Sequence, residues 1–268
     1  MSIEKFFKLI KNLKLFWFYR ELLINLAKRE ISARYKQSIL GYAWVIINPL
    51  AQLAVLSFVF STILKVPSLG VPYIVFLSVA LLPWNLFQLS LTSSSGVLVQ
   101  NSSLITKIYF PREILVYSTI IAKIIDFSFS LVILAILIAI FRVPIYWSIL
   151  WVPIIFAVQI IFTLGISLFV SAFNLFYRDI QYLLTLFLLI WFYLTPIAYP
   201  IEAIPEKFQF LMSLNPMAVI INAYREVIIG GGSPNITSLF TGLMISLVIF
   251  TFSFLLFKKL ERSFADYV

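Results

Sequence analysis

The stretch Lys107-Ile108-Tyr109-Phe110-Pro111-Arg112-Glu113 is a short, charged and aromatic interruption between two long hydrophobic runs, residues 73–99 and 114–140. Each run is long enough to cross a bilayer, because about 20 apolar residues span roughly 30 Å of hydrocarbon. Proline fixes φ, lacks an N–H and disfavours helix at the preceding residue, so one helix should end before Pro111 and another begin after it. Glu113 then falls in the first turn of the new helix, where a carboxylate suits the positive end of the helix dipole. The stretch therefore predicts a rigid turn at a membrane face, which we call the knuckle (residues 107–113). The side chains that it should present outside the lipid are Lys107, Tyr109, Phe110 and Arg112.

The composition of the chain is that of a membrane protein. Of its 268 residues, 62% are hydrophobic and 12% are charged, which is far more apolar than a soluble globular domain. The absence of Cys and His excludes thiol chemistry and removes the usual zinc and haem ligands and the commonest general base. The net charge of +9 is better explained by cytoplasmic loops near anionic lipid than by nucleic acid. We therefore expect an all-α integral membrane protein with no metal site and no nucleic-acid partner.

Six hydrophobic runs predict six transmembrane helices in one domain, residues 41–257. The runs are residues 41–64, 73–99, 114–140, 149–173, 181–199 and 236–257. Asn48-Pro49 should interrupt the first run, and Pro83 should kink the second.

The basic residues predict the orientation of these helices. If the N-terminus lies inside, the inner segments contain 15 Lys and Arg residues, nine of them in residues 1–40, and the outer segments contain four. Such an excess marks the cytoplasmic side. Both termini, the knuckle and a tail formed by residues 258–268 are therefore predicted to be cytoplasmic.

Residues 1–40 have the pattern of an amphipathic helix lying in the membrane interface. Apolar residues recur at helical spacing, as in Ile3, Phe6, Phe7 and Ile10 and again in Tyr19, Leu22, Leu23, Leu26 and Ala27. This helix either only anchors the chain to lipid or also docks a partner with its polar face. Glu30 and Arg34 make it more polar than lipid contact alone requires, and both interpretations stay open.

Residues 200–234 lie outside in this arrangement, and they are too long for a hairpin and too apolar for a free loop. Pro200, Pro205 and Asn215-Pro216 break the segment into pieces too short to span. Two short helices that dip back into the outer leaflet fit this pattern, which requires protein or a water-filled cavity to cover the broken backbone. A globular outer cap is the alternative.

Two features within the spans are candidate functional sites. Lys123 and Asp126 are three residues apart on the third span, so they can pair on one face, either as a structural pair or as the lining of a pathway. Aromatic side chains are dense in the second and fifth spans, and some could line a path for sugar rings rather than only the core or the interfacial belt. The candidate lining residues are Trp84, Phe87, Trp191, Phe192 and Tyr193.

Catalysis by this chain finds little support. Asp126 is the one carboxylate clearly within a span, and the sequence contains no phosphate-binding loop of the G-x-x-x-x-G-K-[ST] type. If the protein uses ATP, another chain binds it. A membrane glycosyltransferase or acyltransferase remains a distant alternative, because it would need a catalytic His or clustered carboxylates.

Several short segments, in this order and at this spacing, resemble the transmembrane permease subunit of type-2 ABC exporters, in the branch that moves lipid-linked polysaccharide. The segments are residues 28–41 (KREISARYKQSILG), Leu82-Pro83-Trp84, the knuckle, Tyr177-Arg178-Asp179-Ile180, Asn215-Pro216-Met217 and Phe264-Ala265-Asp266. Each is weak alone, and together they extend over nearly the whole chain.

The resemblance implies an inner-membrane homodimer with a channel along its axis, which works with two copies of a separate ABC ATPase. ATP and magnesium would bind to that ATPase, and this chain would be neither an enzyme nor a cofactor carrier. The cargo would be a lipid-linked polysaccharide of the O-antigen type, with teichoic acid, capsule or a small lipid or drug as alternatives. The implied ATPase-coupling residues are Glu30, Arg34, Lys107, Tyr109, Phe110, Pro111, Arg112, Glu113, Arg178 and Asp179. The implied outer gate residues are Phe208, Leu211, Asn215, Pro216 and Met217.

Overall fold

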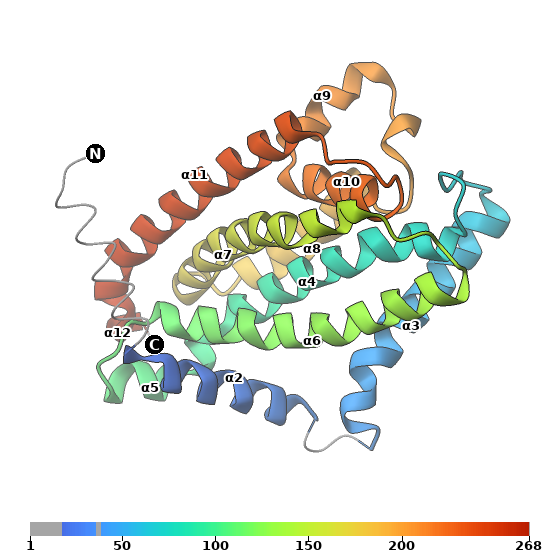
Figure 1. Ribbon diagram of the computed structural model, residues 1–268. Coiled ribbons are helices and arrows are strands. Elements are labelled where there is room, and N and C mark those ends of the chain that lie inside the picture. The colour runs from blue at the N-terminus through green and yellow to red at the C-terminus, as the bar shows by residue number, and fades with distance from the viewer. Residues whose placement is uncertain (1–17, 36–38, 268) are drawn as a thin grey trace.

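The computed structural model describes residues 18–35 and 39–267, and the regular structure in these ranges is entirely helical (Figure 1). The amphipathic pattern around Ile3 to Ile10 lies outside the described residues. The longer helices are α2 (Arg20–Tyr35), α3 (Trp44–Ser57), α4 (Tyr73–Gln100), α6 (Glu113–Ile140), α7 (Val152–Phe176), α8 (Ile180–Leu194), α10 (Pro216–Ile228) and α11 (Ile236–Leu260). The shorter helical segments are η1 (Gly41–Ala43), η2 (Phe58–Ile63), α5 (Ser102–Lys107), η3 (Trp147–Trp151), η4 (Ile201–Ala203), α9 (Glu206–Leu214), η5 (Glu261–Ser263) and α12 (Phe264–Tyr267).

Five of the described helical stretches are long and apolar enough to cross a membrane, which confirms an all-α integral membrane fold. They are Gly41–Ile63, Tyr73–Gln100, Glu113–Ile140, Trp147–Phe176 and Ile236–Ser263. The fifth predicted run forms α8, which is apolar but ends at Leu194, five residues before its expected end. Thr195-Pro196 follows, and helices commonly end at or before the residue that precedes a proline. The count of six spans therefore stays a prediction.

Helix α4 is the centre of the bundle. It packs against α6, α7, α8 and α10, and 78% of its most apolar window is buried within the chain. The corresponding figure for the α3 stretch is 6%, and α3 lies across α4 and α6 on the outside of the bundle (Figure 1). The interruption predicted at Asn48-Pro49 is wrong, because α3 continues through Pro49. Proline is tolerated inside membrane helices, where neighbouring groups and local adjustments satisfy the carbonyl that it leaves unbonded.

Helices α7 and α11 pack along most of their length, and small residues permit the close approach. A Cβ atom built on Gly165 would lie 2.9 Å from the Cα and N atoms of Phe250, so the two backbones are nearly in contact. A Cβ atom built on Gly242 of α11 would lie 3.1 Å from a Val219 methyl group of α10. Dispersion contacts of this kind stabilise helix pairs in lipid, where burial from water contributes little.

The segment between α8 and α11 contains the two short helices that the sequence predicts. Helix α10 is mostly buried against α4, α7 and α11, whereas α9 has no buried residue and contacts α10 and α11. The exposed side chains of α9 include Phe208 and Leu211. The re-entry of these helices into the membrane stays a prediction.

Candidate functional site

The knuckle has the backbone that the sequence predicts, but it presents fewer side chains than expected. Helix α5 ends at Lys107, α6 begins at Glu113, and the Tyr109 side chain is 94% exposed. Phe110 is only 6% exposed, because it packs with Ile105 and Ile114 in an apolar cluster at this end of the bundle. The expectation that Phe110 projects outwards is therefore wrong for this chain, since its ring contributes to the chain's own core. Of the four side chains predicted to face outwards, Lys107 and Tyr109 are exposed, and the coupling role of the knuckle stays a prediction.

The C-terminal end of α11 is bonded to the knuckle through a polar cluster that the sequence does not indicate. The Glu261 carboxylate accepts a hydrogen bond from the Arg112 backbone N–H at 2.9 Å, and the Arg112 guanidinium donates to the Glu261 carbonyl at 2.8 Å. Lys258 donates to Glu113 at 2.7 Å and to Glu261 at 3.0 Å. We call these four residues the staple. Arg112 and Glu113 are thus bound within the chain, and no local pattern could have indicated partners almost 150 residues away.

Helix α2 packs along the first turns of α6. On its apolar face, Leu23 and Leu26 are buried in the same cluster as Phe110 and Ala27 is buried beside them, so this face contacts protein rather than lipid alone. Lys123 of α6 is 5% exposed, and its Nζ lies 3.8 Å from the Glu30 carboxylate of α2. The structure therefore shows a partner for Lys123 on another helix, and pairing with Asp126 stays a prediction. The Arg34 side chain lies outside the part of the chain that the structure describes.

The turn after α7 lies at the same end of the molecule as the knuckle. Tyr177, Arg178 and Asp179 are exposed there. The preceding residue, Phe176, packs against Phe264 and Tyr267 of α12, with ring centroids 6.0 and 4.8 Å away, and α12 also contacts α5. The two turns and the C-terminal helix thus form one face (Figure 1). We call this face, with Lys107, Tyr109, Arg178 and Asp179 exposed on it, the docking face.

Of the aromatic side chains predicted to line a path for sugar rings, some lie in the core of the chain and others lie at its surface. Trp84 and Phe87 are fully buried in an aromatic cluster, in which Phe87 stacks on Phe162 and lies edge-to-face with Trp191, so they are core residues rather than lining. Their burial follows from the central position of α4. Trp191 and Phe192 are half-buried, and Tyr193 is 62% exposed. Lining of a path by these three side chains stays a prediction.

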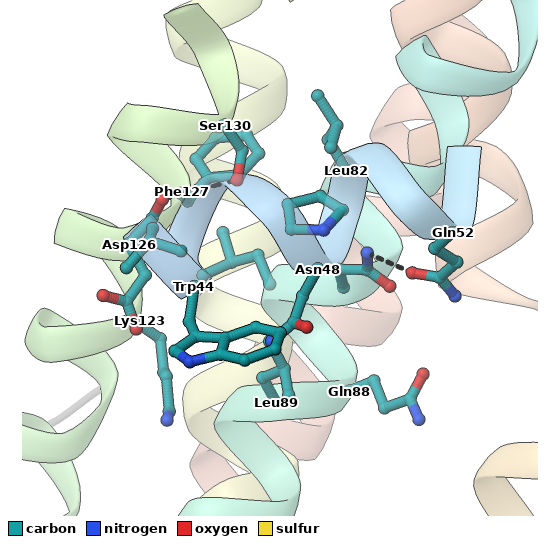
Figure 2. Close-up of a pocket in the computed structure, with 14 residues that line it drawn as sticks. Trp44, Asn48, Gln52, Leu82, Gln88, Leu89, Lys123, Asp126, Phe127 and Ser130 are labelled. Carbon is teal, nitrogen blue, oxygen red and sulfur yellow. Dashed lines mark hydrogen bonds between the residues drawn. The ribbon is translucent and has the colours of Figure 1, made fainter. Parts of the chain in front are cut away.

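A cavity of about 340 Å³ with both polar and apolar side chains in its walls lies between α3, α4 and α6, within the spans (Figure 2). Its walls include Lys123 and Asp126, together with side chains that the sequence analysis did not assign to a functional site. Trp44, Asn48 and Gln52 come from α3, and Asn85 and Gln88 come from α4. The signal that could have found them is the spacing of polar residues in runs that are otherwise apolar.

At the other end of the bundle, three of the predicted gate residues form or adjoin the start of α10. The Asn215 side chain accepts hydrogen bonds from the Met217 N–H at 3.1 Å and from Trp191 Nε1 at 3.0 Å, so it caps α10 and ties it to α8. Pro216 and Met217 are buried in the first turn of α10. A gating role for these residues stays a prediction.

Comparison with known proteins places these features in a family. The model of the ABC-2 type transporter family matches residues 21–229. An O-antigen export system permease protein RfbA of Klebsiella pneumoniae is 32% identical over 251 residues, which are 92% of this chain and 94% of the relative. A protein of the same name from Myxococcus xanthus is 28% identical over 250 residues, 92% of this chain and 95% of the relative. The polysialic acid transport protein KpsM of Escherichia coli is 24% identical over 240 residues, 88% of this chain and 92% of the relative. The chain is therefore a membrane-spanning permease subunit that belongs to the ABC-2 type transporter family.

Proposed function

We propose that this chain forms the channel of an ATP-driven exporter that moves a lipid-linked polysaccharide of the O-antigen type across the inner membrane. The observation that carries the proposal is the near full-length similarity to permeases named for O-antigen export. The similarity to the polysialic acid transport protein favours capsular polysaccharide as the second candidate cargo. Teichoic acid, a small lipid or a drug would be further cargos of the same class of transporter.

We further propose a homodimer with two copies of a separate ATPase bound at the cytoplasmic side. The sequence contains no phosphate-binding loop, so ATP and magnesium would bind to that partner. Two apolar surfaces support the dimer: the α3 stretch is almost unburied, and α8 exposes Leu183, Phe187 and Tyr193. Closed two-fold symmetry is the commonest arrangement of soluble oligomers, and we extend it to this membrane subunit. The mass of the purified complex tests this stoichiometry, and an active complex with one copy of each chain would contradict it.

The docking face is the candidate contact with the ATPase. Tyr109 is almost completely exposed, Lys107 lies beside it, and the staple keeps the turn between α5 and α6 bonded to α11. Because the turn is rigid, movement of the ATPase on closure would move α6 and would not be absorbed by bending of the turn. Its cationic side chains would meet an acidic groove on the partner.

The experiment is to replace Lys107 and Tyr109 by Ala together and to measure ATPase binding and polysaccharide export. Truncation of a central aromatic at an interface commonly costs about 2 kcal/mol or more, so the ATPase should bind roughly 30-fold more weakly. Trp147→Ala is the matched control, because Trp147 is 88% exposed and lies in η3, which joins the opposite ends of α6 and α7. Normal binding and export in the double variant would show that the knuckle is only a turn. If cells that contain the wild-type chain do not export their own polysaccharide, the proposed cargo is wrong.

A further inference from the structure

Three polar stripes from three different spans meet at the cavity between α3, α4 and α6. Trp44, Asn48 and Gln52 are spaced four residues apart, so they share one face of α3. Asn85 and Gln88 share a face of α4, and Lys123 and Asp126 share a face of α6. All of these side chains line one cavity of about 340 Å³ (Figure 2). Polar groups inside a membrane are costly and usually mark the path of a substrate or ion, so their convergence indicates a bound polar group.

Hydrogen bonds within the wall fix the orientation of its amides. Asn85 Nδ2 donates to Gln52 Oε1 at 2.8 Å, and Trp84 Nε1 donates to Gln88 Oε1 at 2.9 Å. Each of these bonds occupies either the oxygen or the nitrogen of a side-chain amide, and the other atom of that amide points away from the bond. The Asn85 oxygen and the nitrogens of Gln52 and Gln88 are therefore available as an acceptor and two donors for a ligand. Asn48 adds a further amide at the centre of the view in Figure 2.

The opposite wall and the open edge complete the lining. Lys123 is buried and lies near the Glu30 carboxylate, so its charge is balanced within the chain. Asp126 lies one turn further along α6 and contributes a carboxylate. At the open edge, Trp44 is 39% exposed, and its indole lies across the cavity between the α6 and α4 side chains in Figure 2. The lining thus combines amides, a carboxylate and the Trp44 indole with apolar side chains, among them Leu82, Leu86, Leu89 and Phe127.

We propose that this cavity binds a sugar residue of the exported glycan while it passes through the membrane; the inference rests on the proposed function. Sugar hydroxyl groups both donate and accept hydrogen bonds, which matches fixed amides and a carboxylate, and the C–H face of a sugar ring packs on an aromatic ring. The volume lies at the lower end of the usual range for small-molecule sites, which fits a unit of one or two sugars. A hydrocarbon chain would offer no hydrogen bond to the Asn85 oxygen or to the Gln52 and Gln88 nitrogens, so lipid is the poorer occupant.

Photo-crosslinking tests the occupant directly. A benzophenone amino acid is placed at Asn48 in one variant and at Leu50 in another; Leu50 is 40% exposed on the far side of α3 and does not line the cavity. Both variants are irradiated in cells that make the glycan and in matched cells that cannot make it. We expect a glycan-linked product only at Asn48 and only in the first cells. A product at Asn48 that persists without glycan, as lipid or a second copy of the chain would give, overturns the proposal. So does the absence of any glycan-linked product there.

Replacement of Asn48 and Gln52 by Leu tests the contribution of the cavity to transport. Leucine is favourable in a membrane helix, so membrane content and ATPase binding should be unchanged while export falls about tenfold. Phe129→Leu is the control, because Phe129 is 47% exposed on α6 and does not line the cavity. Unchanged export in the double variant would overturn the proposal; if that variant fails to insert, the crosslinking result decides. Export by the wild-type chain is measured in parallel, and its absence would instead contradict the proposed function.

Discussion

Arg225 shows how one side chain can stabilise the end of an apolar helix. It is 3% exposed, and its guanidinium donates to the carbonyls of Pro196 at 2.6 Å, Ile197 at 2.5 Å and Tyr199 at 3.1 Å. These carbonyls follow the end of α8, where Pro196 cannot continue the helix. The guanidinium also lies 3.8 Å above the Phe76 ring. A planar group with several fixed donors suits three carbonyls better than a lysine would.

Replacement of Arg225 by Leu should therefore destabilise the protein strongly. Loss of the three hydrogen bonds should cost about 4.5 kcal/mol or more in total, because each hydrogen bond to a charged group contributes roughly 1.5–3 kcal/mol. The midpoint of thermal unfolding in detergent should fall by about 9 °C or more. Lys207→Leu, which removes an exposed cation, should leave the midpoint unchanged. An unchanged midpoint for Arg225→Leu would show that the carbonyls find other partners.

Among the elements, the pair α7 and α11 depends on the absence of a side chain at Gly165. Gly165→Ala would place a methyl group 2.9 Å from the Phe250 backbone, which cannot move aside as a flexible side chain can. Overpacking of this kind costs about 1–3 kcal/mol, so the thermal midpoint should fall by several degrees. Gly232→Ala is the matched control, because nothing lies within 4 Å of its added Cβ. Equal midpoints for the two variants would show that α7 and α11 separate without cost.

The staple joins two elements that are far apart in the sequence, α6 and the end of α11. Glu261→Ala removes the acceptors for the Arg112 backbone N–H and for one of the two Lys258 bonds. We expect the C-terminal residues to detach, so that protease in inverted vesicles cleaves after Lys258 or Arg262 at least tenfold faster. ATP hydrolysis should continue while export decreases, because the knuckle is no longer bonded to α11. Asp266→Ala, at an exposed acid in α12, is the control. Protection equal to wild type would show that apolar packing of Phe257 and Phe264 holds the tail without the staple.

For the whole molecule, the orientation and the outer helices can be tested together, because the chain contains no Cys. Lys207→Cys should react quickly with a membrane-impermeant thiol reagent added to the outside, and Val219→Cys, 6% exposed, should react slowly. If α9 re-enters the membrane, Phe208→Cys and Leu211→Cys should also react slowly, although both side chains are exposed on the chain itself. Arg178→Cys should react only in inverted vesicles. Fast labelling at Phe208 and Leu211 would indicate an outer cap, and labelling of Arg178→Cys from outside would reverse the orientation.

The sequence by itself determined the class of the fold, the positions of the apolar helices and the turn at Pro111. These features follow from local causes, because the length of an apolar run and the missing N–H of proline act within a few residues. The same reasoning was less accurate where a helix could continue or stop early. Pro49 did not break α3, and α8 ended at Leu194.

Only the tertiary structure decided which side chains face outwards and which distant residues meet. It buried Phe110 and exposed Tyr109, although both are aromatic neighbours in one turn. It brought Glu261 to Arg112, Arg225 to the end of α8, and three polar stripes to one cavity. In a chain that is 62% hydrophobic, every span has apolar residues on all sides, so periodicity does not distinguish a lipid-facing side from a protein-facing one. The packing of the helices against one another makes that distinction.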